Sequence, residues 1–121
     1  MKIEEYLEKL KFVPFDEASI IRVEKRFSTT LPDDVKRVLA LAQTGEFLEG
    51  KSFCRKLSLD DIFDANAELN LDFVQKRIIP FFEKGDNDYI VFNLKKGRWE
   101  LFNIVDEISF KASKDLEPLL Q

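Results

Sequence analysis

Residues 78–103 read IIPFFEKGDNDYIVFNLKKGRWELFN and contain three apolar runs separated by two turn signals. The runs are Ile78–Phe82, Tyr89–Leu94 and Trp99–Ile104, and the turn signals are Gly85–Asp88 and Lys95–Arg98. Short runs of β-branched and aromatic residues between Gly, Asn and Asp turns are typical of antiparallel strands. The sequence therefore predicts a three-stranded meander.

The middle run has apolar residues at nearly every position, and only Asn93 interrupts it before Leu94. A strand that is apolar on both sides is usually covered on both faces, so this strand is expected at the centre of the sheet. A turn centred on Lys96-Gly97 predicts the cross-strand pairs Leu94–Trp99, Phe92–Leu101 and Asn93–Glu100. The rest of the chain must then supply two layers of cover.

Composition sets limits on the class of protein. A chain of 121 residues with 12 Phe is long enough for one domain, residues 1–121, with its own core. The single cysteine, Cys54, excludes an internal disulfide and suits a reducing compartment. The sequence shows neither a signal peptide nor a membrane span, which predicts a cytoplasmic protein. The net charge of −4 does not favour binding to nucleic acid.

Helical patterns flank the meander. Apolar periodicity, Pro32 at a first helical position and Gly45 as a helix end predict helices before the meander. A hairpin or edge strand is expected within 47–57, and a strand around Ile108 and Phe110. Pro118 predicts that the last helix is short. The expected helices cover residues 2–11, 16–27, 32–45, 59–70 and part of 113–120.

This order of elements predicts an α+β fold, with a central antiparallel sheet covered by N-terminal and mid-chain helices. From about Asp16 onward the chain resembles the SUKH superfamily, the proteins similar to the Smi/Knr cell-wall-assembly regulators. The residues that carry the resemblance are Leu31-Pro32-Asp33-Asp34 with Leu39, Ile79-Pro80-Phe81, Gly85–Ile90, Gly97-Arg98-Trp99, Asp106-Glu107 and 113–120. For small stand-alone bacterial members, the resemblance implies an immunity protein that binds and neutralises a polymorphic or contact-dependent toxin.

The residues offer little for catalysis. The chain has no His, so the commonest general base and metal ligand is missing, and a Ser-His-Asp or Cys-His arrangement is excluded. No glycine-rich phosphate loop is present, and Cys54 has no visible activating partner. We therefore expect no enzyme, no cofactor and no metal site. A carboxylate-based enzyme stays open as a lesser alternative, because paired acids meet only in the fold.

One acidic stripe is the main candidate for a binding surface. Asp60, Asp64 and Glu68 recur every four residues, opposite the apolar side of the helix predicted over 59–70. An acidic surface suits a basic partner, such as the active-site face of a toxin that acts on nucleic acid. The alternative is an ordinary solvated helix face. A scaffold or regulatory domain of the same fold is the alternative to the immunity function.

Two further features complete the predicted partner-binding set. The acids Asp86 and Asp88 resemble half of a calcium loop, but the twelve-residue pattern is absent, so a turn that extends the acidic surface is preferred. Trp99 is either an interface anchor or a core residue packed on Leu94. The predicted set is thus Asp60, Asp64, Glu68, Asp86, Asp88 and Trp99.

Overall fold

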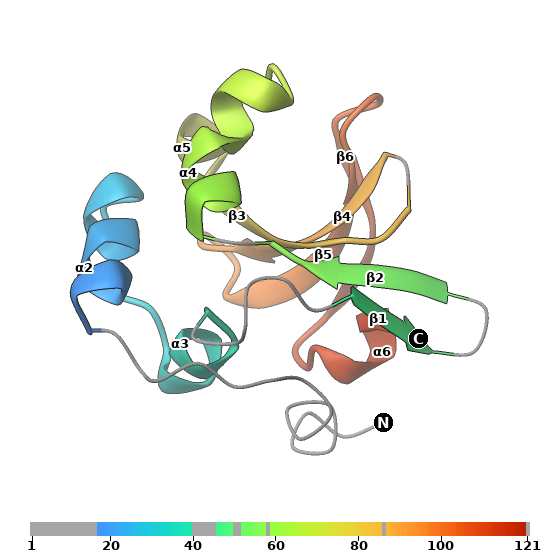
Figure 1. Cartoon of the computed structure of the whole chain (residues 1–121), viewed down its shortest axis with the longest axis horizontal. Coiled ribbons are helices and arrows are strands. Elements are labelled where there is room, and N and C mark those ends of the chain that lie inside the picture. The colour runs from blue at the N-terminus through green and yellow to red at the C-terminus, as the bar shows by residue number, and fades with distance from the viewer. Residues whose placement is uncertain (1–16, 40–45, 50–51, 58, 86, 121) are drawn as a thin grey trace.

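The computed structural model describes residues 17–39, 46–49, 52–57, 59–85 and 87–120. The helix predicted over 2–11, the helix end at Gly45 and the turn residue Asp86 lie outside these residues. The described chain combines helices with an antiparallel sheet, so the predicted α+β class is confirmed. Figure 1 shows the sheet crossing the middle of the molecule, with helices on either side.

Six strands form the sheet and lie in it in the order of the sequence, from β1 to β6. Every neighbouring pair is antiparallel, so the predicted meander extends by a strand pair on one side and a single strand on the other. The hairpin expected within 47–57 is β1 and β2, and the strand expected around Ile108 is β6. The strands are β1 Glu46–Glu49, β2 Ser52–Lys56, β3 Ile78–Glu83, β4 Asp88–Asn93, β5 Arg98–Asn103 and β6 Ile108–Ser113.

The predicted register between the second and third runs is wrong by two residues. Phe92 pairs with Trp99 and Asn93 with Arg98, where the sequence predicted Leu101 and Glu100. The turn holds four residues, 94–97, because the Asn93 side-chain oxygen accepts the backbone N–H groups of Lys95 and Lys96, both at 3.0 Å. Gly97 then closes the turn with its N–H on the Asn93 carbonyl at 2.8 Å and a φ of 63°.

Helices cover both faces of the sheet. In Figure 1, α4 and α5 lie above it, while α3 and α6 lie below it. The α2 helix sits beside α4, and the Arg22 guanidinium lies 4.7 Å from the centre of the Phe63 ring. The short α5 was not predicted, and α6 is short, as Pro118 required. The helices are α2 Glu17–Arg26, α3 Asp33–Leu39, α4 Leu59–Glu68, α5 Phe73–Lys76 and α6 Glu117–Leu120.

The core lies on both sides of β4, as expected for a central strand. Its inner positions from Tyr89 to Phe92 are all buried. Phe92 packs edge-to-face on Trp99, with ring centres 5.1 Å apart, on one face of the sheet. On the opposite face Phe73 of α5 meets Phe102 at 6.4 Å. An aromatic contact therefore anchors α5 to β5 on one face, and a second one joins β4 to β5 on the other.

Candidate functional site

The α4 helix presents the acidic stripe to solvent. Ile62 and Ala65 are 3% exposed and hold the helix on the sheet, on the side where it contacts β3. Asp60, Asp64 and Glu68 are all exposed, and Glu68 also lines a small cavity between the helix and Tyr89 of β4. This geometry follows from the helical period, which separates an apolar stripe from a charged one.

The three carboxylates of this stripe have no partner in the described part of the chain. Neither an ion pair nor a hydrogen bond joins Asp60, Asp64 or Glu68 to another described residue. The last turn of the helix also carries no basic residue. Within the described ranges, this helix face therefore carries three exposed negative charges that are not neutralised.

Asp88 does not extend the acidic stripe of α4, because it lies on the other face of the sheet. Its side chain accepts a hydrogen bond from the Asn103 amide at 2.9 Å, and the two residues are paired across β4 and β5. The next residue, Tyr89, points the opposite way and lines a small cavity with Asp61 and Glu68 of α4. The half-buried Asp88 carboxylate is therefore on the face turned away from α4. Asp86 lies outside the described residues.

Trp99 lies in the core and cannot act as an interface anchor. It is 2% exposed and packs edge-to-face between Phe81 and Phe92, with ring centres 5.1 Å away in each case. A side chain buried to this degree offers no surface to a partner. The core alternative is the correct one, although its neighbours are these two phenylalanines and its cross-strand partner is Phe92 instead of Leu94.

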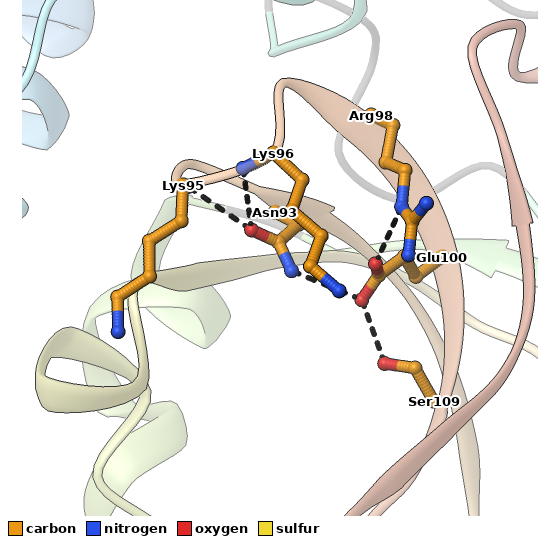
Figure 2. A network of polar contacts seen from close by, with 6 residues as sticks. All are labelled: Asn93, Lys95, Lys96, Arg98, Glu100 and Ser109. Carbon is orange, nitrogen blue, oxygen red and sulfur yellow. Dashed lines mark hydrogen bonds and ion pairs between the residues drawn. The ribbon is translucent and has the colours of Figure 1, made fainter.

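The structure reveals a polar network around Glu100 that the sequence analysis missed. Glu100 is 2% exposed and is the one buried charged residue in the described part of the chain. Figure 2 shows its carboxylate between groups from three strands. Ser109 Oγ donates to Oε1 at 2.7 Å, Asn93 Nδ2 donates to Oε1 at 3.2 Å, and Arg98 Nε donates to Oε2 at 2.9 Å.

These donors keep Glu100 ionised. Burial by itself raises the pKa of Glu100, but hydrogen bonds from Ser109, Arg98 and Asn93 and the positive charge of Arg98 outweigh it. The pKa therefore lies below its usual value of 4.5. A buried, ionised and fully hydrogen-bonded carboxylate is suited to joining strands, and it is a poor proton donor at neutral pH. Its sequence signal is an acid inside the apolar run Trp99–Phe102.

The described residues provide neither a metal site nor a membrane-spanning helix. No group of three or more Cys, Asp and Glu side chains in the described ranges is arranged to hold a metal ion. Among the helices that the structure describes, none has the length and apolar character needed to cross a membrane. The acidic stripe of α4 is therefore the leading candidate site on this side of the molecule.

Comparison with known proteins gives the family. The search of curated proteins returned no match. The model of the SMI1/KNR4 family (SUKH-1) matches residues 14–117, which takes in the helices before the sheet, all its strands and the start of the final helix. This agrees with the resemblance seen in the sequence. Because the match spans most of the chain, the protein belongs to the SMI1/KNR4 family (SUKH-1).

Proposed function

We propose that this protein is an immunity protein, which binds a cognate bacterial toxin and neutralises it by protein–protein contact. Family membership supports this proposal, since small stand-alone members resembling this chain are expected to act as immunity proteins. The acid stripe, defined as Asp60, Asp64 and Glu68, is the proposed contact surface. The observation that carries the proposal is that these three exposed carboxylates have no partner among the described residues.

The proposed mechanism is steric and electrostatic blockade. The acid stripe attracts a basic toxin surface that binds nucleic acid. The bound immunity protein then covers that toxin surface and blocks access to it. The stripe is pre-organised, because the buried side chains of Ile62 and Ala65 fix α4 on the sheet. The Arg22 guanidinium of α2 also packs over the Phe63 ring of α4. Little conformational entropy is then lost on binding. The mechanism needs no cofactor, no metal and no bond-making step, and it operates in the cytoplasm of the cell that makes the toxin.

A co-expression experiment tests the proposal. A flanking gene for a large protein with a variable C-terminal domain supplies the candidate toxin, and that domain is expressed in a sensitive host. The wild-type chain is expected to restore growth and to co-purify with the toxin domain. A flanking region without such a gene, or a toxin domain that the chain neither binds nor neutralises, would contradict the proposal and favour a scaffold or regulatory role.

The surface is tested with two matched variants. The stripe variant carries Asp60→Asn, Asp64→Asn and Glu68→Gln. The control variant removes three exposed carboxylates elsewhere, by Glu17→Gln, Asp33→Asn and Asp115→Asn. Both change net charge equally, so loss of protection in the stripe variant alone assigns the contact to α4. Equal protection by both variants would exclude the stripe.

A further inference from the structure

The β6 strand forms one edge of the sheet and exposes large apolar side chains. Among the strands that the structure describes, β6 pairs with β5 alone. Ile108 and Phe110 of β6 are 54% and 53% exposed, and Val105 in the turn before it is 67% exposed. These are three of the four large hydrophobic residues that the described part of the chain exposes. Apolar side chains gathered on an unpaired strand edge are typical of an interaction surface.

A bulge places Phe110 at this edge. Leu101 pairs with Lys111 and Phe102 with Ser109, so Phe110 is the extra residue without a partner in β5. A lysine on an edge strand often protects it from further pairing. The Lys111 ammonium instead lies 3.4 Å from the Pro118 carbonyl of α6. The centre of the edge therefore presents the apolar Phe110, while the Lys111 side chain extends toward α6.

The two ends of β6 carry opposite charge. The turn before the strand holds Asp106, whose carboxylate has no partner in the described ranges, and Glu107, which pairs with Lys76 at 3.0 Å. An open pocket of about 650 Å³ lies at the other end and is lined by Lys96, Gly97, Arg98, Ala112, Ser113 and Lys114. The ammonium groups of Lys96 and Lys114 have no acceptor among the described residues.

We propose that two copies of this chain pair along β6, antiparallel, with the Asp106 turn of each copy at the pocket of the other that Lys96 and Lys114 line. Antiparallel pairing of identical strands necessarily brings the first end of one strand to the last end of the other. A two-fold axis thus forms the acid–base contact twice and packs the two apolar centres, including Phe110, on each other. This charge complementarity identifies a second copy as the occupant of the edge.

The proposed dimer goes beyond the immunity function and is compatible with it. The acid stripe is on α4, which contacts β3, and β4 and β5 separate β3 from the dimer edge. A dimer through β6 therefore leaves both copies of the stripe accessible. The dimer and the immunity function are tested independently, since the dimer is measured with the pure chain and no toxin.

Sedimentation equilibrium over a wide range of concentration tests the dimer. The wild-type chain is expected to show the mass of a dimer that dissociates on dilution. Phe110→Lys buries like charges at the two-fold axis and is expected to raise the dissociation constant at least about tenfold. The matched control is Ile21→Lys, which changes a 48% exposed apolar residue on α2 and should leave the dimer unchanged. Thermal unfolding verifies that both variants fold.

Charge exchange tests the antiparallel arrangement. Asp106→Lys and Lys114→Asp are each expected to weaken the dimer, whereas the double variant restores opposite charges at both contacts and recovers it. A wild-type chain that is monomeric at every concentration would overturn the proposal. A dimer unaffected by Phe110→Lys, or a double variant no stronger than the single ones, would overturn it equally.

Discussion

At the scale of single residues, Glu100 shows how a buried charge is tolerated in this sheet. Its carboxylate receives hydrogen bonds from β4, β5 and β6, so one side chain connects three strands. Removing a partner would leave a charge buried and unpaired, which is the costly case. Predicting this network required the register of two strand pairs. The sequence placed Asn93 opposite Glu100, but Asn93 in fact pairs with Arg98 and reaches Glu100 diagonally.

Glu100→Gln is expected to destabilise the protein at neutral pH and to flatten its response to acid. The variant loses the ion pair with Arg98 and weakens charged hydrogen bonds, at a cost of about 2 kcal/mol. Since the folded-state pKa of Glu100 lies below its usual value of 4.5, the native carboxylate stabilises the fold above that pH. This stabilisation is lost as pH falls through the lower folded-state pKa, because unfolding then takes up a proton.

Urea unfolding at several pH values measures this effect. The free energy of unfolding of the wild-type chain should fall more steeply below pH 4.5 than that of Glu100→Gln. The control is Asp115→Asn, which changes an exposed carboxylate that has no partner among the described residues, and it should keep the wild-type slope. If the free energies of unfolding of wild type and Glu100→Gln fall with pH at the same slope, the Glu100 carboxylate does not stabilise the folded state.

At the scale of elements, the β4–β5 and β5–β6 turns have the same construction. Asn93 accepts the N–H groups of Lys95 and Lys96, and Asn103 accepts those of Val105 and Asp106 at 3.0 and 2.9 Å. The residues that follow, Leu94 and Ile104, donate their N–H groups at 2.8 and 2.9 Å to the carbonyls of Arg77 and Asn87, which lie just before β3 and β4. The repeated Phe-Asn-aliphatic sequence at 92–94 and 102–104 is the signal for this turn.

The fourth residue of each turn is left-handed, which gives a reciprocal pair of predictions. Gly97 has a φ of 63° and Glu107 a φ of 56°. Gly97→Ala meets no atom within 4 Å, so its expected cost of about 1 kcal/mol is conformational alone. Glu107→Gly removes the same strain and is expected to be neutral or stabilising, since an exposed ion pair with Lys76 contributes little.

Thermal or urea unfolding of Gly97→Ala and Glu107→Gly measures the change in stability that each variant causes. A Glu107→Gly variant that loses more stability than Gly97→Ala would show that the turns are not equivalent. These turns also explain why the register between β4 and β5 was predicted wrongly from the sequence. The apolar runs and turn signals predicted the strands and their order, but the position of the turn depended on the Asn93 side chain accepting two backbone N–H groups. The error of two residues in register followed from centring the four-residue turn on Lys96-Gly97, whereas its centre is Lys95-Lys96.

At the scale of the whole molecule, the sequence predicted what local periodicity controls. The exposed stripe on α4 follows from the four-residue spacing of its acids, and the structure exposes all three. Trp99 and Asp88 depended on long-range packing instead. Trp99 packs on Phe81, which lies at the bulge in β3. The alternation of side chains along β4 places Asp88 on the face away from α4. Neither relation is visible before the strands are paired.

Association kinetics test whether the acid stripe steers a basic partner, as we propose. The toxin domain is mixed with wild type, the stripe variant or the control variant at low and high salt. Steering predicts a fall in association rate of about tenfold for the stripe variant at low salt, with a weaker salt dependence, while the control variant changes little. A stripe variant that associates at the wild-type rate at low salt would contradict the claim.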